Sequence, residues 1–204
     1  MTQGIQKDVS DYYSNKLREF GPTPEGVDWN GQEGQECRFE QLLKVVDHIE
    51  GPLSINDYGC GYGSLFLWME KRFSDVDYLG LDLSEEMVQQ ATQLHGERFV
   101  QGGVSPRVAD VSVASGIFNV RMQHDITSWE QHVKEVLDSM NDRSLRGFSF
   151  NCLTSYSDKE FMREDLYYAD PAKYFDFCKR EYSPQVSLLH DYGLYEFTII
   201  VRKP

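Results

Sequence analysis

Apolar residues follow two different periods along this chain. Short apolar runs are typical of buried strands, whereas stretches in which apolar residues recur every three or four positions are typical of helices. The runs predict strands that begin at Leu53 and that span 76–82, 98–101, 110–119, 145–153, 185–191 and 194–202. The helical stretches are 8–20, 36–49, 64–73, 84–96, 127–140 and 171–180. After two helices at its start, the chain therefore alternates strands with helices.

This alternation predicts an α/β fold in which mostly parallel strands form a doubly wound sheet. Tyr192 and Gly193 separate the last two strands, so these strands are expected to form an antiparallel hairpin at the end of the sheet. A chain of 204 residues has the length of one domain with a sizeable core. We therefore predict a single domain over 1–204.

Three glycines, Gly59, Gly61 and Gly63, follow the first strand and precede a helix. Glycine permits positive φ and lets a ligand approach the backbone closely. The free N–H groups at the start of the helix would face that ligand. A strand, a glycine-rich turn and a helix in this order predict a nucleotide-type pocket at the carboxyl edge of a parallel sheet.

Two acids lie at informative distances from this turn. Asp57 precedes it, and Asp82 follows the glycines by roughly 20 residues, the separation expected when one strand–helix unit intervenes. A dinucleotide fingerprint would need its third glycine at Ser64. The pattern Asp-x-Gly-x-Gly-x-Gly instead resembles motif I of the class I S-adenosylmethionine-dependent methyltransferases, and 78–84 resembles the second strand of that family.

The resemblance implies S-adenosylmethionine as the cofactor. It also implies a seven-stranded, Rossmann-like core over 52–204 and a cap of N-terminal helices over 1–51. In the family, the acid before the turn and the turn backbone hold the methionine portion, and the acid after the second strand binds the ribose. The residues after that acid contact adenine, and the end of the fourth strand lies at the methyl group. Carried over to this chain, the cofactor-binding residues are Asp57, Gly59, Cys60, Gly61, Gly63, Asp82, Leu83, Met87, Gly102, Ser115 and Gly116.

One contact of the family lacks its usual residue here. Many members place an acid after the third strand, where it binds the adenine amino group. This chain has Gly102 and Gly103 at that point, and its next acid is Asp110. We expect backbone groups near Gln101 and Gly102 to take the place of that acid. Met87 has an alternative as well, because methionine often fills gaps in a core.

The cap contributes three candidate acceptor contacts. By the resemblance, Tyr13, Trp29 and Arg38 lie within reach of the pocket, and Arg38 is suited to a bidentate contact with the cofactor's carboxylate. Two of them have a structural alternative. Trp29 can pin its loop to the core, and Arg38 can be solvated or paired at the surface.

Further candidates follow the fourth and fifth strands. Asn119 either contacts the acceptor or satisfies backbone groups of a turn. Tyr156 belongs to a polar and aromatic segment, 154–170, which is expected either to bind the acceptor or to pack on the sheet edge. His124 is a weak candidate for a general base, since no partner for it is evident.

Composition narrows the partners and the compartment. The formal net charge of −13, without a Lys/Arg cluster, disfavours a nucleic-acid substrate and makes a small-molecule acceptor the default. No apolar run has the length of a membrane span, and the first residues lack the apolar core of a signal peptide, so a cytoplasmic protein is expected. The four cysteines form no C-x-x-C pair, so no metal site is predicted. The oligomeric state is left open.

The predicted activity is methyl transfer from S-adenosylmethionine to a small acceptor, achieved mainly by positioning the donor and acceptor. Two alternatives come from other classes of protein. One is an oxidoreductase that uses NAD(P), against which the missing G-x-G-x-x-G pattern argues. The other is a regulatory protein that binds S-adenosylmethionine without turnover, because a fold and its ligand do not prove catalysis.

Overall fold

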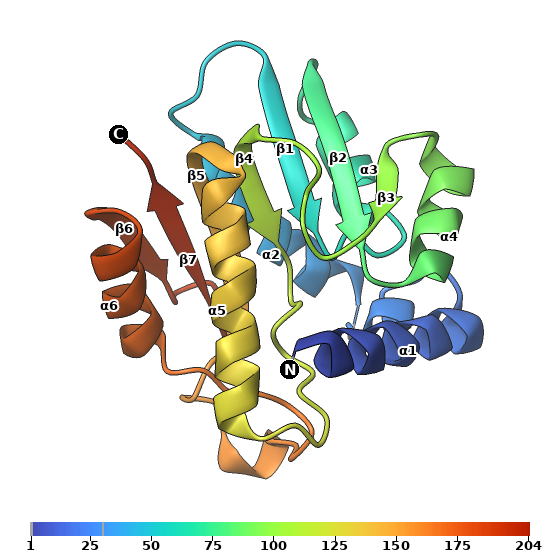
Figure 1. Ribbon diagram of the computed structural model, residues 1–204, viewed down its shortest axis with the longest axis vertical. Coiled ribbons are helices and arrows are strands. Elements are labelled where there is room, and N and C mark those ends of the chain that lie inside the picture. The colour runs from blue at the N-terminus through green and yellow to red at the C-terminus, as the bar shows by residue number, and fades with distance from the viewer. Residues whose placement is uncertain (1, 30) are drawn as a thin grey trace.

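The computed structural model describes residues 2–29 and 31–204. A seven-stranded sheet with the order β3-β2-β1-β4-β5-β7-β6 lies at its centre (Figure 1). The first five strands run parallel, and β7 runs antiparallel to both of its neighbours. The strands are β1 Leu53–Tyr58, β2 Val76–Asp82, β3 Phe99–Gln101, β4 Ala109–Ala114, β5 Ser144–Leu153, β6 Gln185–Leu189 and β7 Glu196–Arg202. This confirms the predicted doubly wound sheet with its C-terminal hairpin.

Helices cover both faces of the sheet and its carboxyl edge. In Figure 1, α5 and α6 lie in front of the sheet, α2 and α3 lie behind it, and α1 runs beneath the carboxyl ends of the strands. The α-helices are α1 Thr2–Phe20, α2 Gln32–Leu43, α3 Ser64–Glu70, α4 Glu85–His95, α5 Ile126–Asp142 and α6 Pro171–Glu181. Three short 3₁₀ helices are η1 Glu25–Val27, η2 Lys44–Val46 and η3 Lys159–Phe161.

The alternation of side chains along the strands divides the core into two clusters. On β5, Phe148 and Phe150 pack with α5 and α6 in one cluster, whereas Val111 and Val113 of β4 pack with α2 and α3 in the other. Strands that are covered on both faces need apolar residues at nearly every position. This explains why the central strands were visible in the sequence as apolar runs.

Several predicted bounds were wrong. The fourth strand ends at Ala114 and not at residue 119, because Gly116 has a φ of 72° and its carbonyl accepts the N–H of Asn119 in a turn. The apolar residues Ile117 and Phe118 belong to this loop, and Phe118 is fully buried there. The helix predicted over 36–49 begins earlier and ends at Leu43. The helix predicted over 8–20 extends back to Thr2.

The start of α5 also differs from the prediction. The sequence Thr127-x-x-Glu130 has the form of a capping box, but the N-cap is Asp125, whose carboxylate accepts the N–H of Ser128 at 2.9 Å. Aspartate is as good an N-cap as threonine, so the upstream residue can open the helix. The caps of two other helices are as predicted, with Ser84 before α4 and Asp170 before α6.

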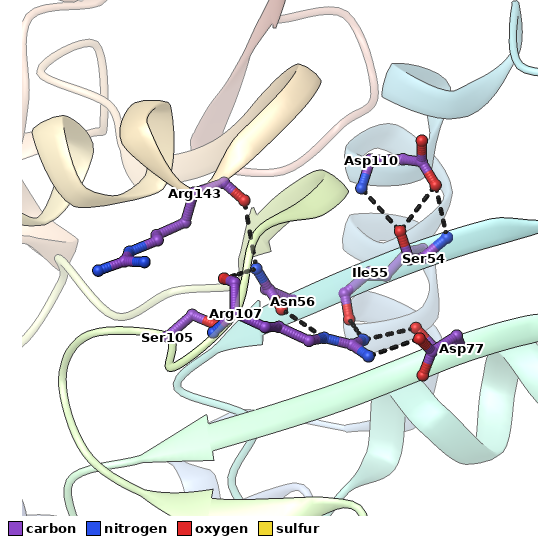
Figure 2. A network of polar contacts seen from close by, with 8 residues as sticks. All are labelled: Ser54, Ile55, Asn56, Asp77, Ser105, Arg107, Asp110 and Arg143. Carbon is purple, nitrogen blue, oxygen red and sulfur yellow. Dashed lines mark hydrogen bonds and ion pairs between the residues drawn. The ribbon is translucent and has the colours of Figure 1, made fainter.

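A polar network ties the connection between β3 and β4 to the sheet (Figure 2). The guanidinium group of Arg107 donates to the side chain of Asn56, to the carbonyl of Ile55 and to both the carboxylate and the carbonyl of Asp77. Asn56 is fully buried in β1. Because Gly102 and Gly103 belong to the same connection, Arg107 anchors the loop that carries them.

Within residues 2–29 and 31–204, no helix is both long and apolar enough to cross a membrane.

Candidate active site

The glycine turn sits directly on the end of β2. The N–H groups of Gly59 and Cys60 both donate to the carbonyl of Leu81, at 2.7 and 3.1 Å. Gly59 has a φ of 72°, and a Cβ there would lie 2.2 Å from Cγ2 of Ile117, so a larger residue does not fit. These two N–H groups already donate within the protein, so they are not available to a ligand. The turn instead contributes by letting a ligand approach the backbone closely.

Asp82 joins the turn to the second strand. One carboxylate oxygen accepts the N–H of Gly61 at 2.9 Å, and the other accepts the N–H of Ser84 at 2.9 Å. Burial raises the pKa of Asp82, and these backbone hydrogen bonds oppose that rise. A carboxylate has about four lone pairs, so Asp82 keeps acceptor capacity toward the space beside it.

Asp57 lies on the other side of the turn and is 2% exposed. The hydroxyl of Tyr78 donates to its carboxylate at 2.5 Å. Burial, aided by the nearby charge of Asp82, raises the pKa of Asp57 to about 7, although the bond from Tyr78 lowers it. A cation placed beside Asp57 would favour its ionised form.

These groups surround an inner cavity at the carboxyl ends of β1, β2 and β4. This is the switch point of the sheet, where ligands bind in open α/β folds. Its open interior is small, about 100 Å³. Twelve of the predicted site residues line it: Tyr13, Trp29, Asp57, Gly59, Cys60, Gly61, Asp82, Leu83, Met87, Gly102, Ser115 and Gly116.

Gly63 is the predicted cofactor residue that does not line the inner cavity. It has a φ of 87° and precedes α3. A Cβ at this position would lie 2.7 Å from the ring of His95 and 3.0 Å from that of Phe99. Gly63 therefore lets α3 start close to α4 and β3, which is a packing role.

The sequence did not single out several residues of the inner cavity. They lie on helix faces whose sequence pattern is that of ordinary core positions. From α1, α2 and α5 the cavity receives Gln6, Val9, Gln35, Phe39, His132 and Val136. Gln35 also donates to the hydroxyl of Ser64 at 3.1 Å, which links α2 to the start of α3. Helical periodicity shows that a face is covered, but it does not show whether a ligand or another helix covers it.

An outer cleft of about 1220 Å³ adjoins the inner cavity. Tyr13, Val27, Trp29 and Gly116 line both spaces. Asn119 lies in the wall of the outer cleft, where its side-chain oxygen accepts the N–H of Leu153 at 3.0 Å. The segment 154–170 lines the cleft as well, through Ser157, Phe161, Arg163, Leu166 and Tyr168.

A closed ring of contacts holds the wall between the two spaces. Arg38 forms a bidentate ion pair with Glu196 at 2.8 and 2.9 Å, and its guanidinium stacks on Trp29 at 3.9 Å from the ring centroid. The side-chain amide of Asn151 donates to Glu196 at 2.7 Å, and its oxygen accepts the N–H of Gly116 at 2.7 Å. Gly116 and Trp29 close the ring, because a Cβ at Gly116 would lie 2.2 Å from the indole.

Three predicted residues lie away from the expected contacts. Arg38 lines the outer cleft and is already paired with Glu196, so it does not face the inner cavity. His124 lines neither space, and its Nε2 lies 3.1 Å from Asp8. Tyr156 is 73% exposed and lines neither space.

Comparisons with known proteins agree with this geometry. The profile of a family described as "Methyltransferase domain" matches residues 55–143. A curated protein of Mycobacterium tuberculosis (strain ATCC 25618 / H37Rv), "Putative methyltransferase Rv1506c", is 56% identical over 165 residues, which cover 79% of this chain and 99% of that protein.

Solved methyltransferase structures share the fold at low identity. A complex of DhpI with SAH has a TM-score of 0.67 at 12% identity and covers 100% of this chain and 98% of that chain. Magnesium protoporphyrin IX methyltransferase (ChlM) from Synechocystis PCC 6803, with bound SAH, has a TM-score of 0.63 at 14% identity, with 98% and 100% covered. The N-methyltransferase NodS from Bradyrhizobium japonicum WM9 has a TM-score of 0.65 at 13% identity, with 96% and 98% covered. With a relative of 56% identity over most of its length, this chain belongs to the class I S-adenosylmethionine-dependent methyltransferases.

Proposed function

We propose that the inner cavity binds S-adenosylmethionine and that the outer cleft binds a small-molecule methyl acceptor. The observation that carries this proposal is the shared wall. Tyr13, Val27, Trp29 and Gly116 line both spaces, so the two spaces meet beside the carboxyl end of β4. A donor in the inner cavity and an acceptor in the outer cleft would therefore approach each other where the two spaces meet, as direct transfer requires.

The polar groups of the inner cavity suit this donor. The carboxylate of Asp57 would accept hydrogen bonds from the ammonium group of the methionine portion. The free lone pairs of Asp82 would accept hydrogen bonds from the ribose hydroxyls. The hydroxyl of Ser115 and Nδ1 of His132 are buried without a hydrogen-bond partner in the protein. Unpaired buried polar atoms are costly, so their presence in the wall fits a polar ligand.

S-adenosylmethionine supplies a methyl group that a positive sulfur already activates. The protein therefore contributes chiefly by holding the acceptor in line with that methyl group and by excluding water. Burial raises the pKa of Tyr13, so its hydroxyl stays protonated at neutral pH and serves as a donor, not as a base. We therefore assign no general base, and His124 has no role in this proposal.

The outer cleft has groups that would orient an acceptor. The side-chain NH₂ of Asn119 is the part of that amide not bonded to Leu153, and it can donate to an acceptor oxygen or nitrogen. Phe161, Tyr168 and Tyr195 present aromatic surface in the same cleft. Phe161 is 64% exposed, and a bound acceptor would cover part of that surface. On this basis, the segment 154–170 is an acceptor-binding insert.

The first test measures the donor. Calorimetry should show that the natural chain binds S-adenosylmethionine and S-adenosylhomocysteine, and that Asp82→Ala weakens binding by roughly 1–3 kcal/mol because a charged hydrogen-bond acceptor is lost. Asp47 is an exposed acid that lines neither the inner cavity nor the outer cleft, so Asp47→Ala is the matched control and should bind both compounds normally. No binding of either compound to the natural chain would overturn the donor assignment.

A second test addresses the acceptor. Methyl-labelled donor is offered with small oxygen, nitrogen, carbon and sulfur nucleophiles, and the product is followed by mass. For any acceptor that is methylated, Asn119→Ala should lower kcat/KM by about tenfold while leaving the affinity for S-adenosylhomocysteine unchanged. An unchanged kcat/KM would remove Asn119 from the acceptor site.

Membership in the methyltransferase family leaves the NAD(P) alternative and the non-catalytic alternative without support.

A further inference from the structure

A histidine in the inner cavity has an unsatisfied ring nitrogen. His132 is 6% exposed, and its Nδ1 is buried without a hydrogen-bond partner in the protein. Folded proteins rarely leave such a group unpaired, because its lost hydration costs free energy. His132 is also one of the residues that line the cavity. A ligand in the cavity is therefore a natural partner for this nitrogen.

The position of His132 indicates which part of the ligand it meets. It lies on α5 one turn before Val136, and both residues line the cavity. The same cavity is lined by Leu83 and Met87 after β2 and by Gly103 after β3. With the ribose at Asp82, as the proposed function places it, the base lies among these residues beyond the second and third strands.

This end of the cavity has no carboxylate for the adenine amino group. In the described part of the chain, the carboxylates that line the cavity are Asp57 and Asp82, and both lie at the glycine turn. After β3 the chain has Gly102 and Gly103, and the side-chain NH₂ of Gln101 donates to the carbonyl of Leu83. The amino group of adenine is a donor and needs an acceptor there.

A neutral imidazole can be that acceptor. Burial lowers the pKa of His132, with a further lowering by His124 that Glu135 opposes, so the ring is neutral at pH 7. One nitrogen of a neutral imidazole carries a proton, and the other has a free lone pair.

We propose that His132 recognises the 6-amino group of adenine by accepting a hydrogen bond from it. In this proposal His132, and not the backbone groups near Gln101 and Gly102 that the sequence suggested, takes the place of the acid that follows the third strand in many relatives. This inference rests on the proposed placement of S-adenosylmethionine in the cavity. It assigns a binding role to α5, a helix that the sequence patterns marked only as core.

The test compares two ligands that differ at one group. S-adenosylhomocysteine and its analogue with hydrogen in place of the 6-amino group are titrated calorimetrically into the natural chain, His132→Leu and His132→Asn. The natural chain should bind the adenine compound about tenfold more tightly, the ratio expected when a buried hydrogen bond is lost. In His132→Leu the two affinities should agree within about threefold. His132→Asn should keep a preference, because its side-chain oxygen can accept.

Val136→Ala is the matched control, since it changes the same wall without touching a hydrogen bond. Val136→Ala should lower the affinity for both ligands by the same factor and leave the ratio of the two affinities unchanged. An undiminished ratio in His132→Leu would overturn the role of His132. If the natural chain binds neither ligand, the donor site itself is wrong. If it binds both equally, the donor site stands and the inference about His132 is rejected.

A second measurement needs no variant to bind ligand. In the natural chain labelled with ¹⁵N-histidine, the unprotonated ring nitrogen of His132 should shift with the adenine compound and not with the analogue. The spectrum of His132→Asn assigns the resonance among the five histidines. An equal shift with both ligands would contradict a bond to the amino group.

Discussion

At the scale of single residues, Asp57 should make both the stability of the fold and ligand binding in the inner cavity depend on pH. Its pKa of about 7 in the folded chain lies well above its ordinary value of 3.8. Between about pH 4 and 7, the folded chain therefore holds a proton that the unfolded chain has released. By linkage, this carboxyl makes the unliganded fold less stable as the pH rises through that range.

Ligand binding should show the opposite dependence. The ammonium group of S-adenosylhomocysteine favours the ionised carboxylate, so a proton must leave Asp57 when the ligand binds below pH 7. We expect the affinity to fall by up to about tenfold for each pH unit below 7. Calorimetry from pH 5.5 to 8.5 measures this slope. Asp57→Asn should bind S-adenosylhomocysteine weakly, with an affinity that changes less with pH. If the affinity of this variant changes as steeply with pH as that of the natural chain, the pH dependence belongs to another group.

At the scale of elements, the ring through Arg38 and Glu196 joins α2 to β7. The side chain of Glu196 is fully buried, and that of Arg38 is 12% exposed. Removing one partner of a buried ion pair leaves the other charge unpaired, which typically costs about 3–5 kcal/mol. Trp29 depends on the same pair, because the guanidinium stacks on its ring.

We therefore expect a large coupling between Arg38 and Glu196. Arg38→Ala and Glu196→Ala should each lower the free energy of unfolding by about 3–5 kcal/mol, and the double variant by clearly less than their sum. Urea denaturation measures the cycle. The matched control is Arg18 and Glu86, a bidentate but exposed pair between α1 and α4, whose coupling should stay below about 1 kcal/mol. Equal couplings for the two pairs would contradict the structural role of the buried one.

The Arg107 network gives a second prediction at this scale. Lysine cannot reproduce the planar fork that reaches Asn56, Ile55 and Asp77 together. Arg107→Lys should therefore destabilise the fold by roughly 2–3 kcal/mol. Arg146→Lys is the control, since Arg146 is half exposed and lies 3.7 Å from its acid. Its effect on the denaturation midpoint should be negligible, and a similar loss in both variants would show that the network is not special.

Elements near the glycine turn were predictable because several local signals agreed there. Apolar runs, glycines and the Ser84 cap all specify β1, α3, β2 and α4 within a few residues. The site beyond that region depends on distant partners. Arg38 and Glu196 are 158 positions apart, so one sequence holds no trace of their pairing. His132 lies on α5 near Trp129, Val133 and Val136, which follow a regular helical pattern. Periodicity therefore assigns His132 to the core.

At the scale of the whole molecule, α1 forms one wall of the inner cavity. Gln6, Val9 and Tyr13 line it, and the open interior of about 100 Å³ is smaller than a nucleoside derivative. Ser14 of α1 and Ser84 before α4 share a buried hydrogen bond of 2.7 Å between their hydroxyls. We expect the cofactor to enter by a movement of α1 relative to the sheet, so this helix should control the rate of association.

A reversible cross-link tests that control. In the variant Ser14→Cys/Ser84→Cys, oxidation should fix α1 in place and slow the association of S-adenosylhomocysteine by at least about tenfold, as expected for a closed lid. Reduction should restore the rate, and Ser14→Cys/Ser84→Ala should not respond to oxidation. Stopped-flow fluorescence follows the binding. Equal rates for the oxidised and reduced forms would show that the ligand enters without movement of α1.

The place of β7 in the sheet has a consequence for how the chain is made. The strand of this sheet that comes last in chain order, β7, lies inside the sheet, between β5 and β6. Glu196, which pairs with Arg38 and accepts a hydrogen bond from Asn151, therefore leaves the ribosome after the other six strands of the sheet. A nascent chain that ends before β7 carries the glycine turn and both acids but lacks the strand that completes the wall. We expect such ribosome-bound chains to bind no methyl donor, so that the domain acquires its cofactor only after β7 has been synthesised.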